Sequence, residues 1–135
     1  MALNLSALAI MAALLDGVLD TFEWYCVGLA AALGIDVGLY FLSPEVEWYV
    51  GLSGVLHGWL AAGALRLVLE GELLGWPLLL GVAGKVLWEQ WAGPLPFSES
   101  SSGGPVVVDA HLYGALSGIV GIIGINACRA RPAKL

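Results

Sequence analysis

The chain has 135 residues, of which 59% are hydrophobic and only 12% are charged. Soluble domains carry about 25% charged residues, so this composition excludes a water-soluble globular domain. The formal net charge of −6 argues against a nucleic-acid partner, which requires a basic surface. We therefore expect one integral membrane domain over residues 1–135, with the lipid bilayer as its main contact.

Five apolar segments predict an all-α membrane protein with about five spans. The first segment is shorter than the roughly 20 residues that a full span needs. A Ser-Pro turn and a stretch rich in Gly, Pro and Ser mark two of the loops. The segments are 3–15, 24–42, 50–69, 73–91 and 105–128, and these two loops are 43–49 and 93–104.

The distribution of positive charge predicts the orientation in the membrane. Three of the five Lys and Arg residues, Arg129, Arg131 and Lys134, follow the last apolar segment. Basic residues favour the cytoplasmic side, so we expect a cytoplasmic C-terminus. The loops 43–49 and 93–104 then face the opposite side, where the third and fifth segments both begin.

Two cysteines and the first segment give no sign of a metal site or of a leader. Cys26 and Cys128 have no CxxC or Cys/His spacing, so neither a metal site nor a disulfide framework is expected, and they are interpreted as packing residues. Residues 3–15 lack the basic start and the cleavage site of a signal peptide. No metal or organic cofactor is expected.

Small residues recur every four positions near the start of the third and fifth segments. This spacing places them on one face of a helix, where they allow two backbones to approach closely. Packing of the two faces would bring Ser53 and His111 within hydrogen-bond distance. The two sets are Gly54, Gly58 and Ala61 or Ala62 in the third segment, and Ala110, Gly114 and Gly118 in the fifth.

Ser53 and His111 suit nucleophilic catalysis. A membrane serine usually bonds back to its own helix, but an ionisable residue such as His111 within a span is a functional candidate. A serine hydroxyl needs an adjacent base to become a nucleophile, and imidazole serves this purpose near neutral pH. Free backbone N–H groups at the start of the third segment, around Gly51, Leu52 and Gly54, could stabilise an oxyanion.

The sequences GLSG at 51–54 and AHLYGALSG at 110–118 resemble the paired GxSG and AHxxGxxxG motifs of rhomboid intramembrane serine proteases. GLSGVLHG at 51–58, KVLWEQ at 85–90 and DAHLYGALSG at 109–118 are similar to the rhombosortase branch. The resemblance covers essentially the whole chain. It implies a rhomboid-like helix bundle, an intramembrane endopeptidase with Ser53 as nucleophile and His111 as general base, and a bacterial inner-membrane location. Its implied substrate is a protein with a transmembrane segment, such as a C-terminal sorting helix preceded by Gly-Gly.

The resemblance also concerns the beginning of the chain. The family has a His-x-x-x-Asn motif on an earlier helix, and its asparagine helps to hold the oxyanion. Asn4 matches that asparagine, whereas the histidine would fall one position before Met1 and the family's first helix is missing. The resemblance therefore implies an N-terminally incomplete sequence. The alternative for Asn4 is a plain polar residue near the N-terminus.

Five further polar residues lie within the third, fourth and fifth apolar segments. His57 lies one helical turn after Ser53 and is a supporting residue or, less favoured, the base itself. Asp109 is interpreted first as a helix cap, and otherwise as a residue that orients His111 or binds a substrate. Tyr113 could pack over His111 or be a plain interface aromatic. Lys85 and Glu89, at i and i+4, are predicted to form a structural ion pair.

Two other functions remain open. A non-catalytic rhomboid relative that binds transmembrane helices would use the same small-residue faces, but it would not need Ser53 and His111 together. A small transporter or channel would need polar residues along a path through the membrane. Here the polar residues gather at one depth, which favours the protease.

Overall fold

The computed structural model of the chain describes residues 2–96 and 105–130. Within these ranges it contains five α-helices and no strand, which confirms the all-α prediction. Each predicted apolar segment overlaps one helix. The helices are α1 (Ala2–Leu14), α2 (Thr21–Leu42), α3 (Ser53–Leu69), α4 (Gly75–Ala92) and α6 (Val108–Ala130).

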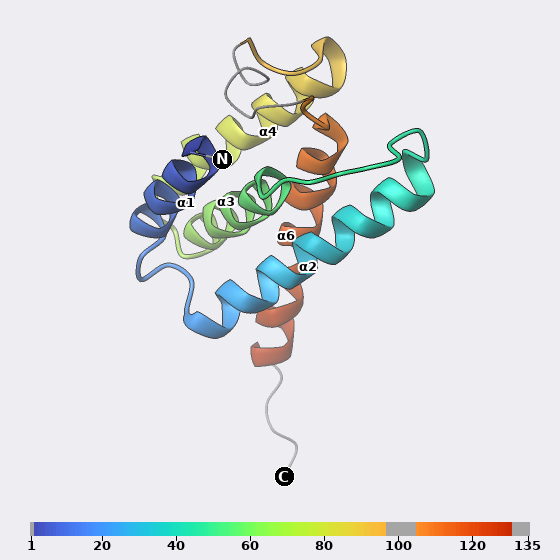
Figure 1. The fold of residues 1–135 in the computed structure, drawn as a ribbon. Coiled ribbons are helices and arrows are strands. Elements are labelled where there is room, and N and C mark those ends of the chain that lie inside the picture. Colours follow the sequence, from blue (N-terminus) through green and yellow to red (C-terminus); the bar gives the residue numbers. More distant parts are fainter. Residues whose placement is uncertain (1, 97–104, 131–135) are drawn as a thin grey trace.

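Helix α3 is the centre of the bundle (Figure 1). It contacts each of the other four helices, and its closest partner is α6. Helix α2 packs mainly on α6, whereas α1 contacts only α3. Within the described residues, α1 and α4 therefore flank α3 without packing on each other.

Glycine allows the backbones of α3 and α6 to approach as the spacing of small residues predicts. A Cβ atom added to Gly114 would lie 2.1 Å from the carbonyl oxygen of Gly54, and one added to Gly118 would lie 2.2 Å from that of Gly58. No real side-chain carbon fits at these distances, so the two glycine positions in α6 accept no larger residue without a shift of the helices. This approach fixes the register of α6 against α3.

Polar side chains fix the N-terminus of α2. The Asp20 carboxylate accepts the backbone N–H of Glu23 at 2.8 Å, while the Glu23 carboxylate accepts the backbone N–H of Asp20 at 2.9 Å. This reciprocal pair is a capping box, which satisfies two of the N–H groups that a helix start leaves free. Helix α2 therefore begins at Thr21 and not at Trp24, where the apolar run starts.

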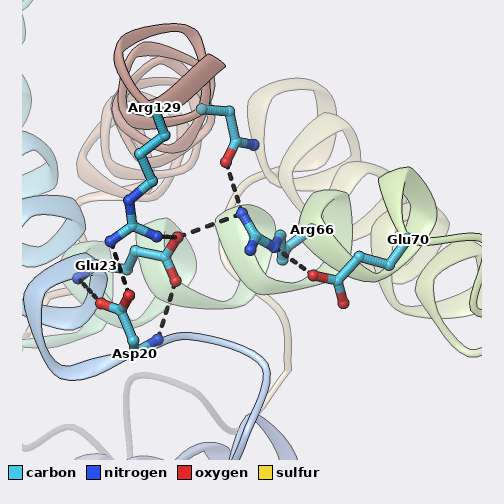
Figure 2. A network of polar contacts seen from close by, with 6 residues as sticks. Asp20, Glu23, Arg66, Glu70 and Arg129 are labelled. Atoms are coloured by element: carbon cyan, nitrogen blue, oxygen red, sulfur yellow. Dashed lines mark hydrogen bonds and ion pairs between the residues drawn. The ribbon is translucent and has the colours of Figure 1, made fainter. Parts of the chain in front are cut away.

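An ionic cluster joins three helices at this end of the bundle (Figure 2). Glu23 is 1% exposed and accepts from Arg66 of α3 at 3.3 Å and from Arg129 of α6 at 2.8 Å. Arg129 also bonds to Asp20, and Arg66 to Glu70 and Asn126. Arg129 thus belongs to the last turn of α6, whereas the other two basic residues of the predicted tail lie outside the described residues.

The outer surface of the bundle is unusually apolar. Many large hydrophobic side chains are exposed, including Leu73 at 84%, Trp91 at 83% and Trp48 at 82%. In the described part of the chain, α2 and α6 are long and apolar enough to cross a membrane, while α3 and residues 4–14 form shorter apolar helices. These features support association with a membrane, because water would not favour such a surface.

Candidate active site

Ser53 and His111 lie side by side at the close approach of α3 and α6. Ser53 is the first residue of α3, and His111 is in the first turn of α6. The Nε2 atom of His111 lies 3.0 Å from Oγ of Ser53, although 58 residues separate them in the sequence. His111 is 4% exposed, so its imidazole is held by packing as well as by hydrogen bonds. The predicted contact is therefore present.

His57 supports His111 rather than replacing it. Its ring stacks on the ring of His111, with centroids 4.2 Å apart and planes inclined by 18°. Its Nδ1 atom lies 2.7 Å from the backbone carbonyl oxygen of Ser53, one turn earlier. A carbonyl oxygen can only accept, so Nδ1 of His57 carries the proton. His111, and not His57, reaches the hydroxyl of Ser53.

Glu89 of α4 occupies the other side of His111. Its Oε2 atom lies 2.8 Å from Nδ1 of His111, and its Oε1 atom accepts from Nζ of Lys85 at 2.6 Å. The predicted ion pair is present, but the contact with His111 was not predicted. The signal in the sequence was the position of Glu89, four residues after Lys85 within an apolar helix. A charged residue in such a segment is a candidate for a functional role.

The start of α3 offers N–H groups beside the nucleophile. The N-cap residue of this helix, Leu52, makes no side-chain capping hydrogen bond. The Gly54 N–H makes only a long contact, 3.4 Å, to the Tyr49 hydroxyl, which itself donates to the carbonyl of Gly51 at 2.8 Å. Burial raises the pKa of Tyr49, so this hydroxyl stays neutral. The arrangement is suitable for an oxyanion.

A cavity of about 720 Å³ opens over these residues. Helix α1 contributes Asn4 to its lining, and α4 contributes Lys85 and Glu89. Ser53 and His111 line the same cavity. The cavity thus extends between α1 and α4, which do not pack on each other within the described residues. Asn4 shares the cavity with Ser53, as its predicted role in an oxyanion site requires.

Asp109 and Tyr113 are engaged elsewhere. The Asp109 carboxylate accepts from Oγ of Ser43 at 2.6 Å, and the Tyr113 hydroxyl lies 2.9 Å from the same oxygen. The ring of Tyr113 fills the space beside Gly38 of α2, where a Cβ atom would meet it at 2.4 Å. Both residues therefore join the end of α2 to the start of α6, and these contacts differ from the support of His111 that was one of the alternatives for each.

One group of side chains could in principle hold a metal ion. Among the described residues, the ligand atoms of His57, Glu89 and His111 lie within 4.8 Å of one another. The ammonium group of Lys85 already occupies one oxygen of Glu89 and would repel a cation at this position. The donor set is therefore better matched to proton transfer than to metal binding.

The arrangement can remove a proton from Ser53, return it to a leaving group and stabilise an oxyanion nearby. These three steps are the ones that hydrolysis or transfer of an acyl group requires. The chain matches no family model, no curated protein and no solved structure. What the site does is therefore inferred from its own residues.

Proposed function

We propose that this chain is a rhomboid-like intramembrane serine endopeptidase. The observation that carries the proposal is the 3.0 Å distance between Oγ of Ser53 and Nε2 of His111 in a partly buried site. A serine alone in an apolar helix has no such partner. The exposed apolar surface and the cavity between α1 and α4 support a site that operates within the bilayer.

The residues account for each proton in the reaction. Nε2 of His111 takes the proton of Ser53 while Oγ bonds to the carbonyl carbon of the substrate. The resulting oxyanion meets the N–H groups at the start of α3 and the amide of Asn4. When the peptide C–N bond breaks, the proton passes from His111 to the leaving nitrogen. Water then releases the acyl group from Ser53 by the same sequence of steps.

Access to the cavity favours a substrate that arrives from the lipid. Helices α1 and α4 both line the cavity and make no contact with each other. A transmembrane segment could enter between them, provided that it unwinds locally to expose a peptide bond. Glycine disfavours helix, so a segment with Gly-Gly beside the scissile bond is the preferred substrate. A bacterial inner-membrane location with a cytoplasmic C-terminus belongs to the same proposal.

The test is cleavage of a transmembrane substrate by purified protein in detergent. Ser53→Ala removes one hydroxyl and should abolish cleavage without unfolding the protein. Ser117→Ala is the matched control, because Ser117 lies in α6 against Gly34 of α2 and is not among the residues that line the cavity with Ser53. Cleavage that persists in Ser53→Ala would reject the proposal. Binding of the substrate without cleavage by the wild type would instead favour a helix-binding protein.

A further inference from the structure

The two carboxylate oxygens of Glu89 have different partners. Oε1 accepts from Lys85 of the same helix, whereas Oε2 lies 2.8 Å from Nδ1 of His111. Glu89 is 1% exposed and its contact with His111 is buried, whereas the side chain of Lys85 is 33% exposed. Hydrogen bonds thus connect the carboxylate of Glu89 in α4 to the imidazole of His111 in α6, and this imidazole to the hydroxyl of Ser53 in α3.

A Ser-His pair needs a defined tautomer of the imidazole. Only an unprotonated Nε2 can accept the proton of Ser53, so Nδ1 of His111 must carry the hydrogen. An ionised carboxylate can only accept, and therefore Glu89 favours the hydrogen on Nδ1. It also stabilises the imidazolium ion that forms after proton transfer. The contact of Lys85 with the same nitrogen is 3.5 Å long and contributes little.

We propose that Glu89 is a positioning residue, which holds His111 in the tautomer that accepts the proton of Ser53. Lys85 fixes the carboxylate by binding its other oxygen. This inference rests on the proposed peptidase function. During acylation the proton moves from Oγ to Nε2 and on to the leaving nitrogen, during deacylation it moves from water to Nε2 and on to Oγ, and the hydrogen on Nδ1 stays in place throughout. Glu89 remains a carboxylate throughout.

A purely structural ion pair makes different predictions. Its loss would destabilise the bundle, because a buried charge would lose its partner, but it would not act on the tautomer of His111. Lys85 and Glu89 would then be equivalent, and removing both would restore stability and activity together, so recovery of activity in a double variant does not by itself separate the two explanations. The tautomer of His111 separates the two explanations.

Glu89→Gln is the informative substitution. The ammonium group of Lys85 requires an acceptor, so it should bind the amide oxygen and turn the amide NH₂ toward Nδ1 of His111. Nδ1 must then accept, and the hydrogen moves to Nε2, which can no longer take the proton of Ser53. We expect kcat to fall by about 10²- to 10⁴-fold, with KM nearly unchanged.

The double substitution Lys85→Met with Glu89→Gln supplies the control. Without the ammonium group the amide is free to rotate and to accept from Nδ1 with its oxygen. The double variant should therefore recover about tenfold or more of the activity that Glu89→Gln loses. The double variant also leaves no unpaired charge in α4, because both the ammonium group and the carboxylate are removed. It can therefore be used to test the tautomer of His111 even if Glu89→Gln fails to fold.

Nitrogen-15 NMR of histidine-labelled protein reads the tautomer independently of activity. The chain has two histidines, and His57→Phe identifies the signals of His111. Glu89→Gln should shift the hydrogen from Nδ1 to Nε2, and the double variant should restore it to Nδ1. An unchanged tautomer in Glu89→Gln, or a changed one without loss of kcat, would overturn the inference. Cleavage by Ser53→Ala would reject the proposed peptidase function, and it is distinguishable from the tautomer result, which does not depend on activity.

Discussion

Gly114 of α6 lies against the backbone of Gly54 of α3, so closely that a Cβ atom on Gly114 would be 2.1 Å from the carbonyl oxygen of Gly54. Gly54 directly follows Ser53, and Gly114 lies three residues after His111. The position of the nucleophile relative to its base is therefore set by backbone contact between two helices. Such contact leaves little freedom for the 3.0 Å hydrogen bond to vary.

Gly114→Ala should separate the two helices and impair both stability and cleavage. Overpacking typically costs about 1–3 kcal/mol, and a displacement near 1 Å can lower the rate about 100-fold. Gly124→Ala is the matched control, because it lies in the same helix and a Cβ atom there would meet nothing within 4 Å. Thermal unfolding and kcat are measured for both. Equal behaviour of the two variants would contradict the role assigned to the close approach.

Asn4→Ala should lower kcat and leave KM nearly unchanged. The side chain would meet a charge that exists only in the transition state, and loss of one oxyanion donor usually costs about 10²- to 10³-fold. Ser6→Ala serves as the control, since Ser6 is an exposed residue of the same helix. An unaffected Asn4→Ala would leave the backbone N–H groups at the start of α3 as the oxyanion donors.

The capping residue Asp20 predicts a pH dependence of stability. Its pKa is held below the ordinary 3.8, first by the backbone N–H of Glu23 and then by Arg129. The folded state therefore binds this proton more weakly than the unfolded state. The stabilisation is fully present above about pH 4 and is lost as the pH falls through the folded pKa.

Asp20→Asn keeps a capping oxygen but removes the charge. Thermal unfolding of this variant in detergent should occur below that of the wild type at pH 7, and the difference should disappear in strong acid. Because Asp20 is exposed, added salt should reduce the difference as well. A difference that grows toward low pH would have the wrong sign and would contradict the assignment.

Topology gives a test that does not depend on catalysis. Single cysteines at Ser101 and Ala133, both outside the described residues, are introduced in a protein without Cys26 and Cys128. An impermeant thiol reagent applied to intact cells should label position 101 and not position 133. Equal labelling of the two positions would contradict the predicted orientation.

The sequence was sufficient to predict the helices and the contact of Ser53 with His111. Both follow from local patterns, because apolar length marks a helix and a four-residue spacing of glycine marks the face that packs closely. The contact between α3 and α6 could be predicted because both helices carry glycines four residues apart, Gly54 and Gly58 in α3 and Gly114 and Gly118 in α6. The capping box moved the start of α2 three residues earlier than the apolar run indicates.

The partners of the remaining polar residues depend on how α2 and α4 are rotated about their axes. Helix α4 is apolar on several sides, so the pattern could not show that Glu89 points to His111. For Tyr113 the sequence left open both packing over His111 and a plain interface role, and in the structure its ring packs beside Gly38 of α2. Arg129 was assigned to a tail because its acidic partners lie more than 100 residues earlier, 106 for Glu23 and 109 for Asp20.

The most direct test of the central claim is covalent labelling of the nucleophile. A fluorophosphonate probe reacts with a serine whose hydroxyl is activated by a neighbouring base. Wild-type protein in detergent should be labelled at Ser53, as located by mass spectrometry of its peptides. Ser53→Ala and His111→Ala should remain unlabelled, and Ser117→Ala should react like the wild type. Labelling at another residue, or undiminished labelling of His111→Ala, would contradict the account.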